Sequence, residues 1–93
     1  MANKPPPFFT APYGVADAAA LQAVARGNAD ATQQKRALDW IINVACATYQ
    51  ISFQPGMPDA TAFMDGRRYA GTEIVKLLKL NLETIRQAKE THV

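Results

Sequence analysis

Two adjacent arginines between two glycines are the residues of this chain that most suggest binding chemistry. The stretch FMDGRRYAG, residues 63–71, has the G-x-x-x-x-G spacing of a phosphate-binding loop from Gly66 to Gly71. Such a loop also needs a strand before the first glycine and a lysine after the second, because backbone N–H groups and the lysine bind the phosphates together. Thr72 stands at the lysine position and no hydrophobic strand precedes Gly66, so phosphate binding is rejected.

A helical interpretation explains the same stretch better. Gly66 and Ala70 lie four residues apart, so on a helix they form a smooth patch that another backbone can approach closely. Each glycine weakens a helix by about 1 kcal/mol, which close packing can offset. We therefore predict a packing motif made of Phe63, Asp65, Gly66 and Ala70.

The paired arginines, Arg67 and Arg68, diverge by roughly 100° on a helix and cannot face one flat partner equally. We expect Arg68 to pair with a carboxylate of the same chain, Asp65 or Glu73, and Arg67 to face solvent or a partner. Both are predicted partner-binding residues. The alternative is that both are solvated surface residues.

Catalytic chemistry is poorly supported. His92 is the only histidine and lies next to the last residue, whereas Cys46 falls among apolar residues at helical spacing, which favours a buried small hydrophobe over a nucleophile. Asp59 and Asp65 are six residues apart and do not share a helical face. We predict a protein that is not an enzyme and that has no catalytic residue, cofactor or metal site.

The 93 residues suffice for one small domain. A single cysteine cannot form an internal disulfide and fits a reducing compartment. No apolar run approaches the roughly 20 residues of a membrane span, and the first residues lack the apolar stretch of a secretory signal. We expect assembly in a cytosol, and a chain this short often gains stability by oligomerising or docking on a partner.

Residues 1–14 form a segment distinct from the rest. Four of its residues are proline, which fixes φ and removes backbone donors, so an extended arm is predicted. Its aromatic side chains are the predicted partner-binding groups of the arm: Phe8, Phe9 and Tyr13. The alternative is that these rings fold back and cover the chain's own helices.

Residues 15–93 predict a small all-α domain of about three helices, of which the last is long. The first begins at Val15, with Asp17 near its start and Gly27 as a stop. The second covers residues 30–53. Asp30 with Gln33 resembles a capping box at its start, with Thr32 as the alternative cap, and its end from residue 50 is ambiguous.

The apolar stripe of this second helix is expected to include Leu38, Ile42, Cys46 and Tyr49. Pro55, Gly56 and Pro58 then make a turn. A third, proline-free helix is expected to run unbroken from Asp59 to near the end of the chain.

The charge pattern gives weak support for DNA contact. The net charge is +2, and residues 60–93 carry six bases and four acids. The acids interleave with the bases, so no purely basic stripe forms, whereas nucleic-acid binders usually present a strongly basic face. An ordinary charged helix surface is the preferred interpretation.

The run ISFQPGMPDATAFMDGRRYAGTEIVKLLKLNLETI resembles a family of small proteins of tailed bacteriophages, especially short-tailed phages, encoded near portal and capsid genes. The resemblance covers the C-terminal half of the chain. The acid before the glycine is commonly Glu in that family and is Asp65 here. The matching residues are Phe53, Asp59, Ala62, Phe63, Asp65, Gly66, Arg67 and Arg68.

The resemblance implies a non-enzymatic structural or accessory virion protein, assembled in the host cytoplasm and located in the virion. The expected partner is the portal, the head–tail connector or the capsid interior, with multiple copies or a homo-oligomer. A DNA-associated packaging factor with a role like that of a small terminase, and a small inhibitor of a host protein, are the alternatives.

Overall fold

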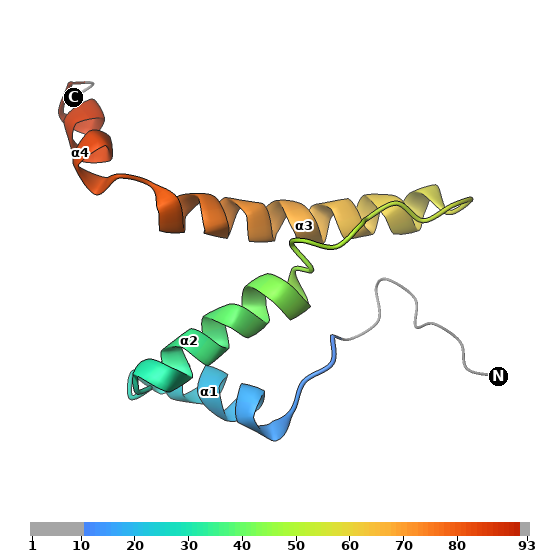
Figure 1. Cartoon of the computed structure of the whole chain (residues 1–93), viewed down its shortest axis with the longest axis horizontal. Helices are drawn as coiled ribbons and strands as arrows, with labels where there is room; N and C mark the ends of the chain where they lie inside the picture. The colour runs from blue at the N-terminus through green and yellow to red at the C-terminus, as the bar shows by residue number, and fades with distance from the viewer. Residues whose placement is uncertain (1–10, 92–93) are drawn as a thin grey trace.

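The computed structural model describes residues 11–91 as an all-α fold without strands (Figure 1). This confirms the predicted class, whereas the prediction of about three helices with a long last one is not exact. Residues 11–91 contain four α-helices, the third of which is the longest, and one π-helical turn, η1. Their bounds are α1 Val15–Arg26, α2 Ala31–Trp40, η1 Ile41–Ala45, α3 Pro58–Lys79 and α4 Leu82–Thr91.

Local capping signals fix both ends of α1. The Asp17 carboxylate accepts a hydrogen bond of 2.9 Å from the Gly14 N–H, which is one of the backbone donors that a helix start leaves unpaired. Gly27 ends the helix in the left-handed region with φ 77°, a conformation that glycine adopts without a steric cost. The predicted start signal and stop are confirmed.

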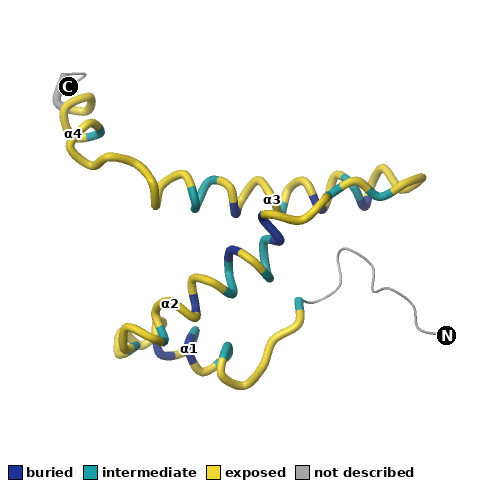
Figure 2. Tube along the Cα trace, in the orientation of Figure 1, coloured by how far each residue is buried: buried dark blue, intermediate teal, exposed yellow. Residues whose placement is uncertain are grey.

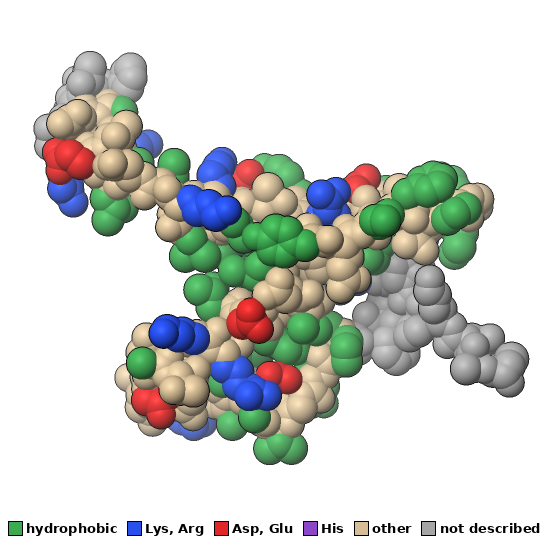
Figure 3. Space-filling model, in the orientation of Figure 1, with side chains coloured by type: hydrophobic (Ala, Val, Ile, Leu, Met, Phe, Trp, Pro, Cys, Tyr) green, Lys and Arg blue, Asp and Glu red, His purple; other side chains and the backbone are tan. Residues whose placement is uncertain are grey.

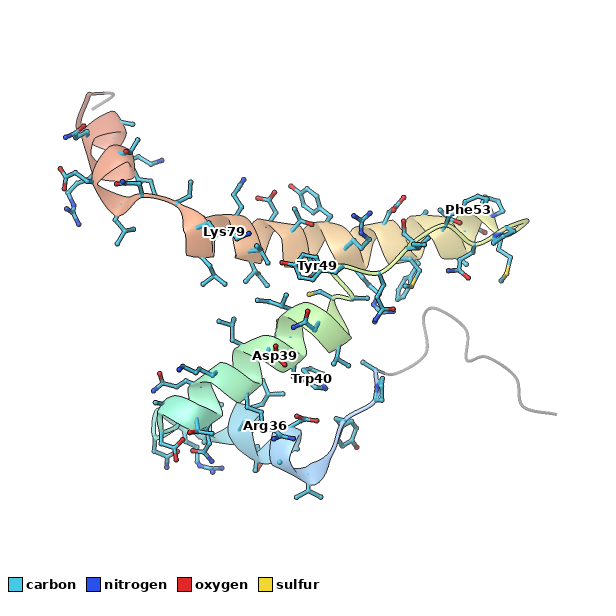
Figure 4. The ribbon with its side chains drawn as sticks, viewed as in Figure 1. Arg36, Asp39, Trp40, Tyr49, Phe53 and Lys79 are labelled. Atoms are coloured by element: carbon cyan, nitrogen blue, oxygen red, sulfur yellow. The ribbon has the colours of Figure 1, made fainter. Side chains whose placement is uncertain are left out.

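Helices α1 and α2 form a hairpin whose contact surface is made of small side chains. Ala20, Ala23 and Ala37 are buried, so the two helices can approach closely. Arg36 on α2 reaches Asp17 on α1 at 2.9 Å (Figure 4). Trp40 donates from Nε1 to the Pro12 carbonyl at 2.9 Å, which attaches the segment before α1 to the end of α2.

The second helix begins as predicted and ends earlier. Asp30 and Gln33 form the reciprocal capping box, with hydrogen bonds of 2.8 and 3.1 Å. The helix then widens into η1, where the Cys46 N–H bonds to the Ile41 carbonyl, and stops. Tyr49, predicted on its apolar stripe, lies beyond the helix and is exposed.

The predicted unbroken third helix is two helices. Leu80 is extended, with φ −70° and ψ 147°, and the Asn81 side chain accepts a hydrogen bond of 3.0 Å from the Thr84 N–H, which caps α4. The Leu and Ile spacing continues through this point, so periodicity alone gave no reason to expect a break. Figure 1 shows α4 turned away from the axis of α3.

The molecule is elongated. Its radius of gyration is 16.9 Å, whereas a compact domain of this length has about 12 Å. Figure 2 shows burial confined to the α1–α2 contact and to the region where the segment after α2 meets α3. No large side chain of the described residues is fully buried, so the folded chain leaves much of its apolar surface uncovered.

Candidate functional site

The end of η1 is held by Arg67 of α3. The Arg67 guanidinium donates from Nε to the Ala45 carbonyl at 2.9 Å and from Nη2 to the Val44 carbonyl at 3.0 Å. The last carbonyls of a helix have no partner within it and carry partial negative charge, so a cation is favoured there. The same guanidinium lies 6.0 Å from the centre of the Phe63 ring.

Arg68 binds the same segment a little further along the chain. Its Nε donates to the Thr48 carbonyl at 3.2 Å. The predicted ion pair of Arg68 with Asp65 or Glu73 is therefore wrong, because the carboxylates are engaged elsewhere: Asp65 accepts from the Ser52 hydroxyl and Glu73 pairs with Lys76. Partner binding through the arginines stays a prediction, while the contacts that the structure has are within the chain.

Thr48 reverses the chain after η1. Its N–H and its hydroxyl both donate to the Ile42 carbonyl, at 3.1 and 2.7 Å, and the residue is buried. The preceding Ala47 has φ 49°, a left-handed conformation that costs a non-glycine residue roughly 1–2 kcal/mol. A buried, hydrogen-bonded Thr48 therefore fixes an unfavourable turn in place.

Gly71 is the residue of α3 against which this turn packs. A Cβ atom at Gly71 would overlap the Thr48 hydroxyl and lie 2.8 Å from the Cys46 Cβ and 2.9 Å from the Thr48 Cβ. Real Cβ atoms essentially never lie this close to another atom, so only glycine fits. At Gly66, in contrast, a Cβ would meet nothing within 4 Å of its own chain.

The predicted packing motif is therefore displaced by five residues. Gly66 and Ala70 are exposed, and the close approach occurs at Gly71. Phe63 remains partly exposed and Asp65 binds Ser52. Gly71 belongs to the same FMDGRRYAG stretch, but nothing in the sequence around Thr48 indicated that these two residues would be in contact.

The segment between η1 and α3 lies along α3. Gln54 donates its N–H to the Thr61 hydroxyl at 2.8 Å, and Ser52 bonds to Asp65. The large apolar side chains of this segment nevertheless point outward. We call them the 49–57 surface; its members are Tyr49, Ile51, Phe53 and Met57 (Figure 4).

Exposure of the 49–57 surface is extensive, since Ile51 is 83% exposed and Phe53 is 65% exposed. Figure 3 shows hydrophobic side chains gathered along α3 and the segment beside it. An open hollow of about 450 Å³ at the start of α3 is lined by Phe53, Met57 and Thr61 among others. An apolar surface of this kind is typical of a protein contact site.

Tyr13, the described member of the predicted aromatic set of the arm, is 67% exposed. Phe8 and Phe9 lie outside the described residues. Of the predicted arm, residues 11–14 have no helical structure. The division of the chain at residue 14 stays a prediction.

Metal-ligating side chains are not clustered in the described part of the chain. Within it, no three His, Cys, Asp or Glu side chains are grouped so that they could hold a metal ion. Cys46 is a half-buried free thiol. Every buried side-chain polar atom among residues 11–89 has a hydrogen-bond partner.

Ion pairs within single helices balance the charges of α3 and α4. Lys76 pairs with Glu73 at 2.9 Å, and this carboxylate raises the pKa of Lys76 through its hydrogen bond. Arg86 pairs with Glu83 at 3.0 Å. The helical surface is therefore mixed in sign.

None of the helices traced between residues 11 and 91 combines the length and the apolar character needed to cross a membrane. Comparison of the chain with models of protein families, with curated proteins and with solved structures finds no match.

Proposed function

We propose that the protein is a non-enzymatic structural or accessory component of a bacteriophage particle, which docks on the portal, the head–tail connector or the capsid interior. The observation that supports docking is the inverted distribution of apolar side chains. The buried ones are mostly alanines, Ala20, Ala23, Ala37, Ala47 and Ala60, whereas the large aromatic and aliphatic ones are exposed. A protein with this distribution gains stability by covering its large side chains with a partner.

The 49–57 surface is the proposed docking site. It combines two aromatic rings with a methionine and an isoleucine, and aromatic residues and methionine are enriched in the cores of protein interfaces. It is also held in place, because Gln54 and Ser52 attach the segment to α3. A surface fixed in advance loses little conformational entropy on binding.

The phage context of the proposal rests on the resemblance of residues 51–85 to small proteins of short-tailed phages. Phe53 and the run Gly66-Arg67-Arg68 are among the residues that carry this resemblance. In this chain Phe53 belongs to the exposed surface, while Arg67 and Arg68 hold the segment that carries it. The motif thus combines a contact residue with the residues that position it.

Mass spectrometry of purified phage particles and of capsid precursors tests the proposal. The protein is expected in a constant ratio to the portal or the capsid protein. Absence from both kinds of particle contradicts it. Ile51→Ser with Phe53→Ser is expected to reduce incorporation, and Tyr69→Ser, which removes an exposed ring elsewhere on α3, is the matched control.

The DNA-packaging alternative receives no support from the side-chain contacts. Arg67 and Arg68 donate to backbone carbonyls, and Lys76 is paired with a carboxylate. Phosphate binding needs several cations presented together on one face. A gel-shift assay at low salt tests the alternative, and binding that falls steeply with added salt would revive it.

A further inference from the structure

The C-terminal half of α3 has an apolar face that the chain itself leaves uncovered. Between Pro58 and Gly71, the helix buries Ala60, Met64 and Gly71 against the segment between η1 and α3. The same 3–4 spacing continues beyond it through Ile74 and Leu78, but Leu78 is 57% exposed. We call Ile74, Leu77 and Leu78 the α3 stripe.

Helix α4 also has an apolar face that no other helix of the described residues covers. Its apolar residues Leu82 and Ile85 share one face by their spacing, and Leu82 is 68% exposed. Among the elements described, α4 contacts no other helix. It has 10 residues, and helices shorter than about 12–15 residues are marginal in water without tertiary packing.

The connection between the two helices directs α4 away from the α3 stripe of its own chain. Only Leu80 and Asn81 separate them, Leu80 is extended, and Asn81 is fixed by capping α4. Figure 1 shows the resulting bend. Short connections of this kind favour exchange of an element between copies over its return onto the same chain.

We propose that α4 of one copy packs on the α3 stripe of a second copy, and reciprocally, to form a two-fold symmetric dimer. A second copy covers both apolar surfaces at once. Each chain supplies an α4 for the α3 stripe of its partner and an α3 stripe for the α4 of its partner. The helices run antiparallel, with Ile74 of one copy beside Ile85 of the other. This inference stands apart from the phage context and does not use the 49–57 surface.

Charge favours a second copy as well. Glu73 with Lys76 and Glu83 with Arg86 form pairs within their own helices, so these four side chains bring no net charge to a contact between two copies. The α3 stripe and the apolar face of α4 contain no charged residue. The apolar contact between two copies therefore encloses no charged side chain of either face.

Sedimentation equilibrium of the full chain over roughly 5–500 μM tests the dimer. The expected mass at high concentration is twice 10.1 kDa. Leu78→Lys is expected to weaken the dimer by at least about tenfold, since its side chain lies at the centre of the contact. A wild-type chain that stays at 10.1 kDa throughout overturns the proposal.

Tyr69→Lys is the matched control, because Tyr69 is 66% exposed on the same helix but lies off the α3 stripe. It should leave the dimer unchanged. Equal weakening by Leu78→Lys and Tyr69→Lys overturns the proposal. Far-UV circular dichroism of both variants checks that they remain helical, so that loss of the dimer is not confused with unfolding.

Disulfide trapping tests the antiparallel arrangement in a Cys46→Ala background. Mixing an Ile74→Cys chain with an Ile85→Cys chain is expected to give a mixed disulfide dimer under mild oxidation. Preferential linkage of two Ile74→Cys chains to each other would overturn the proposed arrangement.

Discussion

The same substitution at two glycines of α3 should change stability in opposite directions. Gly66 and Gly71 both lie inside the helix, where alanine is favoured over glycine by about 1 kcal/mol. They differ in their surroundings, because a Cβ meets nothing of its own chain within 4 Å at Gly66 and overlaps Thr48 at Gly71. Gly66→Ala should therefore stabilise the protein by about 1 kcal/mol.

Gly71→Ala has two opposing contributions. The helix gains about 1 kcal/mol, while forcing a methyl group into a filled contact costs about 1–3 kcal/mol. Displacing Thr48 also disturbs its buried hydrogen bonds to the Ile42 carbonyl, and leaving such groups unpaired costs about 1–3 kcal/mol. The expected net loss is about 1–5 kcal/mol.

Thermal and urea unfolding followed by circular dichroism measures both variants at one fixed protein concentration. For a domain of this size, 1 kcal/mol shifts Tm by about 4–8 °C. Gly66→Ala should raise Tm by roughly that amount and Gly71→Ala should lower it. A Gly71→Ala chain as stable as wild type would refute the packing argument at Thr48.

A double-mutant cycle locates the effect. Thr48→Ala removes the hydroxyl that the new methyl group would meet, so Gly71→Ala should be less damaging in that background than in wild type. Additive effects would mean that the two residues are not in contact. Thr48→Ala alone should also destabilise the protein, because it removes the hydrogen bond from the Thr48 hydroxyl to the Ile42 carbonyl. Both single variants are therefore measured beside the double variant.

Three further predictions concern single contacts. Arg67→Ala should lower the free energy of unfolding by about 2 kcal/mol, because it removes two charge-assisted hydrogen bonds to carbonyls at the end of η1. Urea unfolding measures this loss, and an unchanged midpoint would contradict the role of Arg67 at this helix end. Asn81→Ala should lose about 1 kcal/mol within α4, seen as faster amide exchange there but not in α1. The Gly14 N–H, with help from Arg36, holds the pKa of Asp17 below its ordinary value of 3.8; this stabilisation is present above pH 3.8 and is lost as pH falls through the lower folded-state pKa. Asp17→Asn should therefore flatten the dependence of Tm on pH in that range, and identical pH profiles would count against the contact.

Helix starts and stops were predictable where the signal lies within one turn. Gly27 and the capping box of Asp30 and Gln33 act on backbone groups three or four residues away, so their effect does not depend on the rest of the fold. The cap at Asn81 is of the same kind. It was missed because the apolar spacing of the flanking residues continues through it.

The all-α class and the starts of the first two helices could be predicted from the residues alone. The tertiary structure alone decided where the second helix ends and which glycine is in contact. Nothing local stops the helix at Ala45; Arg67 and the reversal at Thr48 hold its end, from more than 20 residues away in the case of Arg67. The sequence of α3 does not distinguish Gly66 from Gly71. Gly71 is required only because the segment after η1 packs against it. Local hydrogen bonding can be inferred from neighbouring residues, whereas steric fit depends on which distant backbone arrives at the site.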